Sequence, residues 1–227
     1  MRPLSWPCPT ADGNVVPEYA LAFEPSGPHR LLMIPALFDE ANRLRRFTVE
    51  TMRLLAEAGI ACVLPDLPGC NESLQDLAIQ TPDGWAHALA ACVAHFQPTH
   101  VLGLRGGCLF TPSGLPALHF APIKGASILR QMLRARILST REAGREEARE
   151  ELETMARTHG IALAGYTLGA AFVQAFESME PPLATCTITQ GELGGSGLWL
   201  RAEPSEDTGQ AVALAQRIQS ALESALP

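Results

Sequence analysis

The stretch from Thr99 to Phe110, THVLGLRGGCLF, decides the fold of this chain. Residues 100–104 form a short apolar run, which is typical of a strand buried on both faces of a parallel sheet. A glycine-rich turn follows at Gly106 and Gly107, and we expect the apolar segment beyond it to be helical. The stretch therefore predicts a buried strand that turns sharply at Arg105 into a helix.

The glycines around Arg105 match a known turn. In the nucleophile elbow of α/β-hydrolases, G-x-S-x-G, a serine stands on a sharp turn between a strand and a helix. Here the five residues read Gly103-Leu104-Arg105-Gly106-Gly107, with arginine at the nucleophile position. A guanidinium stays protonated at any working pH, so it cannot attack an ester. The pattern predicts the fold and the place of a site, but not a reaction.

Composition narrows the class of protein. The 227 residues are 47% hydrophobic and 18% charged, which suits one α/β domain with a full core. The net charge of -7 without a basic run disfavours nucleic-acid binding. We expect no membrane span, because no run of about 18 apolar residues occurs, and no signal peptide, because MRPLSWPCPT lacks a continuous apolar region.

The six cysteines form no C-x-x-C pair, and no histidine cluster lies near them in the sequence. A zinc site is therefore not expected, and neither is any other metal or cofactor. Free thiols are typical of a reducing compartment, which indicates a cytoplasmic protein.

Apolar runs and turn residues predict the other elements. We expect strands at 15–23, 31–35, 60–64, 117–121, 183–189 and 198–202, a short strand or extended segment at 161–166, and helices at 42–58, 81–96, 127–138, 142–159, 168–179 and 205–226. This order predicts a mostly parallel central sheet with helices on both faces. We expect a single domain over residues 1–227, in which an insertion at about 122–160 forms a small helical cap.

The parts of a hydrolytic triad are missing from their expected places. The fold places an acid and then a histidine after the nucleophile, but no histidine lies beyond His159. Cys108, His119 and Asp66 are candidates for relocated chemistry. Each also has a structural interpretation: a buried thiol, a core histidine and a turn-forming acid. We therefore name no catalytic residue.

Arg105 allows two interpretations. A guanidinium at the elbow, beside the free N–H groups of a helix start, would bind a carboxylate or phosphate. Alternatively, Arg105 pairs with an acid of the loop that borders the elbow, and Asp39 and Glu40 are suitable partners. The two interpretations are compatible if a ligand competes for the pair.

Four stretches, taken in order, resemble the exosortase A system-associated hydrolases of type 2, a family of bacterial α/β-hydrolase-like proteins. Residues 38–46 are similar to its F-x-E-E-M-N-x-x-R-R loop, 103–107 to its G-L-R-x-G elbow, 121–134 to P-V-x-x-G…F-L-x-Q-F-L-R, and 164–168 to A-G-Y-x-L-S. Ala41 replaces the family's methionine, and Gly169 its serine. The resemblance implies a link to exopolysaccharide and protein-sorting systems.

Three functions follow. The first is binding of an anionic acyl or sugar-phosphate molecule without efficient hydrolysis. Its predicted binding residues are Phe38, Glu40, Asn42, Arg45, Arg46, Arg105 and Gly106. The second is an active esterase, thioesterase or acyltransferase with Cys108 or Ser113 as a relocated nucleophile. The third is a scaffold that binds a protein partner through the basic face of residues 127–138.

Overall fold

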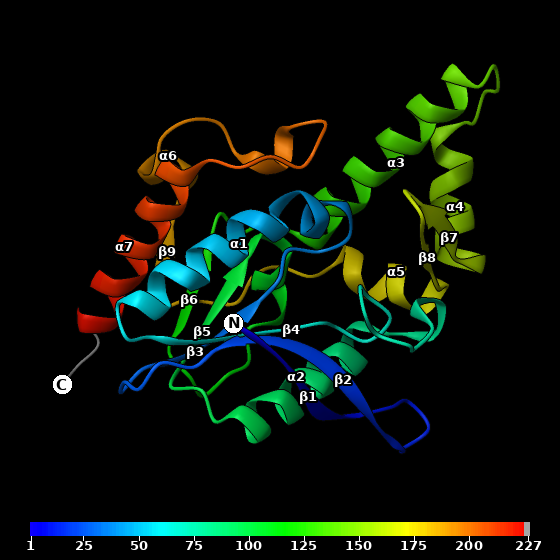
Figure 1. Cartoon of the computed structure of the whole chain (residues 1–227). Helices are drawn as coiled ribbons and strands as arrows, with labels where there is room; N and C mark the ends of the chain where they lie inside the picture. The colour runs from blue at the N-terminus through cyan, green and yellow to red at the C-terminus, as the bar shows by residue number, and fades with distance from the viewer. Residues whose placement is uncertain (225–227) are drawn as a thin grey trace.

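The computed structural model describes residues 1–224 and has a seven-stranded sheet at its centre (Figure 1). The strands lie in the order β1-β2-β4-β3-β5-β6-β9. Their bounds are β1 Arg2–Pro9, β2 Val15–Phe23, β3 Arg30–Ile34, β4 Ala61–Pro65, β5 His100–Leu104, β6 Ala117–Phe120 and β9 Cys186–Ile188. β2 runs antiparallel to both β1 and β4, and the remaining pairs are parallel. The predicted mostly parallel sheet is confirmed.

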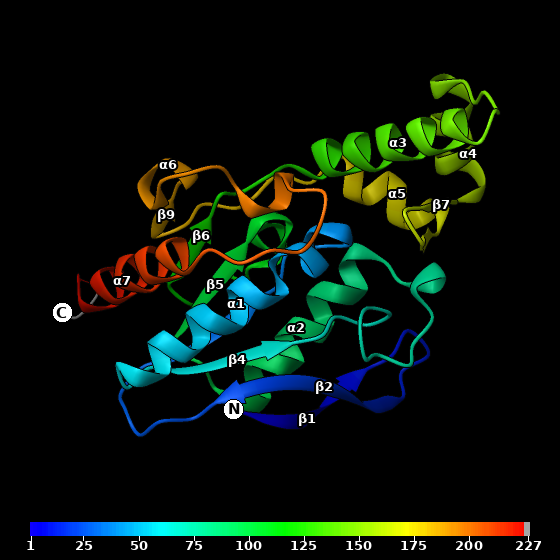
Figure 2. The same cartoon turned by 45° about the horizontal axis from the view of Figure 1, so that its top comes forward.

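Helices cover both faces of the sheet. α1 (Asp39–Glu57) and α7 (Thr208–Ser224) pack side by side on one face (Figure 2). α2 (Pro82–Phe96) covers the other face. The start of α2 is as predicted: the Thr81 hydroxyl accepts a hydrogen bond of 3.0 Å from the Gly84 amide, with Pro82 as the first helical residue.

A helical excursion, residues 121–185, lies between β6 and β9. It contains α3 (Gly125–Glu142), α4 (Arg149–His159), the β-hairpin β7 (Ile161–Leu163) and β8 (Tyr166–Leu168), and α5 (Ala170–Glu177). Both views show α3 and α4 extending away from the sheet, while α5 lies closer to α2 (Figures 1 and 2). Buried residues of α3, α4 and α5 join the core on the α2 face.

Several expectations were wrong in detail. The predicted helix 142–159 is broken, because the chain turns at Gly144 with a φ of 73°. The predicted strand 198–202 is instead a 3-10 turn, η3 (Leu198–Leu200). The helix expected after Arg105 is the short 3-10 helix η2 (Arg105–Phe110). Two short elements, η1 (Leu77–Ile79) and α6 (Gln190–Leu193), were not predicted. The last two residues of the predicted helix 205–226 lie outside the described residues.

β1 was also missed, because Pro3, Pro7 and Pro9 argue against a strand. It lies at the edge of the sheet, where proline is tolerated because an edge strand leaves N–H groups unpaired. Within residues 1–224, no helix is long and apolar enough to cross a membrane.

Candidate functional site at the elbow

The turn after β5 has the geometry of an elbow. β5 ends at Leu104, Arg105 takes a φ of 54°, and η2 begins at once. The flanking glycines are required: a Cβ on Gly103 would lie 2.6 Å from the Cys108 Cα, and one on Gly107 would lie 2.4 Å from the Pro35 carbonyl oxygen. The backbone thus turns as in G-x-S-x-G, and the side chain of Arg105 occupies the position of the nucleophile.

The Arg105 guanidinium is fully engaged by its neighbours. Its Nε and Nη2 groups donate hydrogen bonds of 3.0 and 2.9 Å to the two carboxylate oxygens of Glu40. Its Nη1 group donates a bond of 2.9 Å to the carbonyl oxygen of Ala121. The indole of Trp199 lies against the guanidinium, with 4.0 Å from the Cζ atom to the ring centroid. The pairing with Glu40 that was considered from the sequence is therefore present.

This ion pair is buried. The side chains of Arg105 and Glu40 are only 8% and 10% exposed. Glu40 lies in the first turn of α1, where the helix dipole favours a negative charge. A bidentate arginine–carboxylate pair fixes both the distance and the plane of its partners. The pair therefore holds α1, the elbow and the chain after β6 in one arrangement.

Strained backbone surrounds the guanidinium. Phe38, Arg105 and Ala121 follow the carboxyl ends of β3, β5 and β6, and their φ angles are 54°, 54° and 45°. Non-glycine residues rarely adopt this region, and each such residue costs about 1–3 kcal/mol. Strain of this kind clusters at functional sites. Arg105 and Ala121 are joined by a hydrogen bond, and Phe38 comes two residues before Glu40, so these strained positions mark the elbow as the candidate site.

The space beside the elbow is filled. A Cβ placed on Gly106 would lie 2.7 Å from the Ile128 Cδ1 atom and 2.9 Å from the Leu37 Cδ1 atom. None of the five cavities identified among the described residues is lined by Arg105. In this arrangement, Ile128 and Leu37 leave no room for an added group beside Gly106. η2 is also too short to supply the helix start on which the sequence-based anion site relied.

The predicted rim residues lie on or just before α1, but they have different partners. Asn42 donates a hydrogen bond of 3.2 Å to the Tyr166 hydroxyl, and the Phe38 ring packs edge-on against the same tyrosine. Arg45 lies 3.4 Å from the buried carboxylate of Asp66. Arg46 instead forms an exposed ion pair with Glu206, on the side of α1 that faces the start of α7. The contacts of Arg46 therefore lie away from the elbow.

The relocated nucleophiles lack the partners that they need. Cys108 is buried, its Sγ atom lies 3.1 Å from the Gly103 carbonyl oxygen, and burial raises the pKa of its thiol to about 12. Ser113 lies in the loop before β6, at the amino-terminal end of the parallel strands, whereas the elbow lies at their carboxyl-terminal end. His119 is a buried strand residue whose Nε2 atom lies 2.9 Å from the Thr111 hydroxyl. No histidine of the described chain lies beside Arg105.

Asp66 anchors a loop. Its carboxylate, 0% exposed, accepts hydrogen bonds from Asn71 Nδ2 at 2.9 Å and from the Glu72 amide at 3.3 Å.

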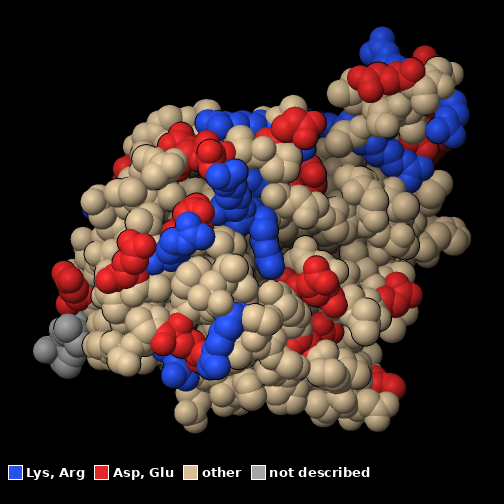
Figure 3. Space-filling view, viewed as in Figure 1, with Lys and Arg blue, Asp and Glu red and all other residues tan. Residues whose placement is uncertain are grey.

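Residues 1–224 also contain no group of three His, Cys, Asp or Glu side chains that could hold a metal ion. Acidic and basic side chains lie next to one another on the face shown in Figure 3, including on the helical excursion.

Sequence reasoning missed the residues that complete the arginine site. Trp199 comes from a segment far from the elbow in the sequence, and Ala121 contributes only a backbone carbonyl, so the sequence did not indicate that either contacts Arg105. The only sign of Trp199 was a large aromatic residue within the glycine-rich stretch GELGGSGLW.

The overall fold resembles those of solved structures. No family model matches the sequence, and no curated protein matches it. The mouse α/β-hydrolase domain-containing protein 10 superposes with a TM-score of 0.60 at 11% identity, over 99% of each chain. DcsB, in complex with its substrate analogue, gives 0.57 at 13% identity, over 98% of this chain and 99% of that one.

A third structure, Est1E from Butyrivibrio proteoclasticus with ferulic acid bound, gives a TM-score of 0.51 at 17% identity. It covers 77% of this chain and 70% of its own. At such low identities, these likenesses concern the fold alone. The chain has the α/β-hydrolase fold, as the sequence predicted, with arginine at the nucleophile elbow.

Proposed function

We propose that this protein is a non-hydrolytic, cytoplasmic member of the α/β-hydrolase fold that binds an anionic small molecule at its elbow. The observation that carries the proposal is the bidentate ion pair between Arg105 and Glu40. Glu40 presents to Arg105 the same two oxygens that a ligand carboxylate or phosphate would present. Binding is then an exchange, in which the ligand replaces Glu40 on the guanidinium.

The cover over Arg105 makes this exchange feasible. Trp199, which stacks on the guanidinium, is itself only half-buried. It lies in η3, and Gly194 and Gly195 come just before, both with positive φ. The ring is the part that must swing aside for a ligand to approach. Phe38, Glu40, Asn42, Arg45 and Gly106 then border the opened site, and Arg46 contributes charge from outside.

A binding screen tests the exchange. Isothermal titration with acetate and sugar phosphates is compared for the wild type, Arg105→Gln and Trp199→Ala. We expect Arg105→Gln to lose binding and Trp199→Ala to tighten it, because the cover is gone. Arg53→Ala is the matched control, since Arg53 is an exposed arginine of α1 that pairs with Glu50. Anion binding that is unchanged by Arg105→Gln would remove the proposal.

The link to exopolysaccharide systems rests on the family resemblance. The stretches that carry it supply Glu40, Arg105 and Ala121, which meet at the elbow. We propose that the ligand is an acyl or sugar-phosphate intermediate of exopolysaccharide assembly in a bacterium. Deleting the gene should lower secreted polysaccharide, and the wild-type gene should restore it while Arg105→Gln should not. If both genes restored secreted polysaccharide equally, the role in polysaccharide assembly would not depend on Arg105.

A further inference from the structure

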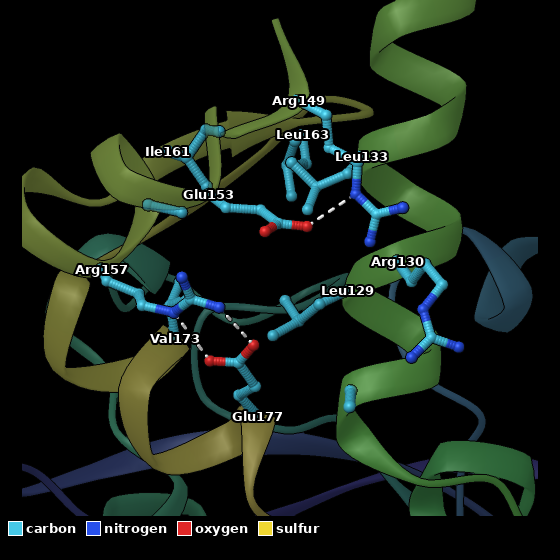
Figure 4. Close-up of a pocket in the computed structure, with 12 residues that line it drawn as sticks. Leu129, Arg130, Leu133, Arg149, Glu153, Arg157, Ile161, Leu163, Val173 and Glu177 are labelled. Atoms are coloured by element: carbon cyan, nitrogen blue, oxygen red, sulfur yellow. Dashed lines mark hydrogen bonds and ion pairs between the residues drawn. The ribbon is translucent and has the colours of Figure 1, made fainter. Parts of the chain in front are cut away.

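A second site lies within the helical excursion, away from the elbow. The inter-helix cavity between α3, α4, α5 and β7 has a volume of about 190 Å³ (Figure 4). Its apolar walls are side chains that are almost completely buried, namely Leu129, Leu133, Ile161, Leu163 and Val173. An enclosed apolar cavity of about 150 Å³ accepts benzene, so the volume of this hollow, which is partly open to solvent, is enough for a small ring or a short chain.

Charged side chains border these walls. Arg149 donates a hydrogen bond of 2.7 Å from its Nε atom to Glu153, and Arg157 binds both oxygens of Glu177 at 2.9 and 2.7 Å. Figure 4 shows both pairs as dashed lines across the cavity. Each glutamate is therefore already neutralised by its own arginine.

The third arginine differs from the other two. Arg130, on α3, lines the cavity but has no hydrogen bond or ion pair with any side chain or carbonyl within residues 1–224. Three arginines thus border the cavity with two glutamates, which leaves one positive charge next to an apolar hollow. A partly open hollow with apolar side chains in its walls and an unpaired arginine at its border favours a molecule with an apolar body and a single negative charge.

We propose that the inter-helix cavity binds a small amphipathic monocarboxylate, with its chain or ring against Leu129, Leu133 and Val173 and its carboxylate on Arg130. A phosphate dianion fits less well, because its second charge would face Glu153 and Glu177 with no further free cation. The site does not include Arg105, so it does not depend on exchange at the elbow. α3 separates the two: Ile128 packs on the elbow, whereas Leu129 lines the cavity.

Isothermal titration with octanoate tests this site, with octylamine as the matched cation. We expect saturable binding of octanoate at millimolar concentrations or below, and binding of octylamine at least about tenfold weaker. Arg130→Gln should weaken octanoate binding by about tenfold or more, since hydrogen bonds to charged groups contribute about 1.5–3 kcal/mol. Arg134→Gln is the matched control. It removes an exposed arginine from the next turn of α3 that does not line the cavity, and should leave binding unchanged.

A cavity-filling variant locates the ligand. Ala156→Leu places a larger side chain on the α4 wall and should abolish octanoate binding, and its melting temperature is measured in parallel to check that the variant is folded. Octanoate is also titrated into Arg105→Gln, in which the elbow has lost its guanidinium. Binding that remains there, and that Arg130→Gln or Ala156→Leu removes in the same background, belongs to the cavity. No binding to the wild type, or equal binding by the wild type, Arg130→Gln and Ala156→Leu, would overturn the proposal.

Discussion

The elbow and the inter-helix cavity use the same residue types in opposite ways. At the elbow, every nitrogen of the Arg105 guanidinium is hydrogen-bonded, and the pair with Glu40 is nearly inaccessible to water. In the cavity, Arg130 is exposed and has no hydrogen-bond or ion-pair partner for its side chain within residues 1–224. The difference shows that the place where this fold normally carries chemistry is closed by a salt bridge, while an open cavity lies in the excursion.

The largest expected effect separates a buried ion pair from an exposed one. Glu40→Ala leaves the buried guanidinium without its counter-charge, so it should lower the free energy of unfolding by about 3–5 kcal/mol. The double variant Glu40→Leu/Arg105→Leu should lose much less than the sum of the losses in its two single variants, Glu40→Leu and Arg105→Leu, because it removes both charges together. Urea unfolding of Glu40→Ala, the two single variants and the double variant gives these values. A loss below about 1 kcal/mol for Glu40→Ala would mean that the pair is not buried in solution.

The second effect is a dependence of the unfolding free energy on pH, and it comes from a histidine in the core rather than from the elbow or the inter-helix cavity. Burial lowers the pKa of His119 below its usual value of about 6.5. The unfolded chain therefore binds a proton more readily, and the stability from His119 is complete above about pH 6.5 and lost as pH falls toward the folded-state pKa. His119→Gln should flatten the fall in unfolding free energy between pH 7 and 5, by at most about 1.4 kcal/mol per pH unit. His87→Gln, at an exposed position of α2, should leave the slope unchanged. An unchanged slope in His119→Gln would contradict this.

The third effect is small, and it completes the comparison of ion pairs. Arg149 and Glu153 at the cavity are one turn apart on α4 and are 48% and 26% exposed. Exposed pairs of this kind contribute about 0–1 kcal/mol and weaken with salt. Glu153→Ala should therefore shift the urea midpoint far less than Glu40→Ala does. A loss as large as that of the buried pair would place Glu153 in a tighter network than the structure shows.

The fourth prediction is that Cys108 is unreactive in the folded protein. Cys108 should not react with iodoacetamide in the folded protein at pH 8, because burial raises the pKa of its thiol to about 12. Turnover of p-nitrophenyl acetate should stay at the background rate in the wild type and in Cys108→Ala. Mass spectrometry of the alkylated protein and an absorbance assay measure these. Ester turnover that Cys108→Ala abolishes would favour the active hydrolase that the geometry disfavours.

The fold could be predicted from the sequence, and so could the position of Arg105 and one of its partners at the elbow. Apolar runs and glycines at fixed spacing predicted β5, the turn at Arg105 and the parallel sheet, because these depend on local pattern. The partner Glu40 could be considered from the sequence, since loops after adjacent parallel strands meet at one edge. Trp199 could not, because its contact joins segments far apart in the chain without periodicity. The inter-helix cavity was also hidden, because it depends on the break at Gly144 that lets α4 fold back beside α3.

The exchange at the elbow is tested most directly by chemical rescue of Glu40→Ala, a variant with room for a small carboxylate beside Arg105. Its melting temperature is measured in sodium acetate and in sodium chloride of equal ionic strength, together with the wild type and Glu40→Ala/Arg105→Met. The account predicts that acetate raises the melting temperature of Glu40→Ala by several degrees more than chloride does, and that the other two proteins show no such difference. Equal responses to acetate and chloride in Glu40→Ala would contradict it.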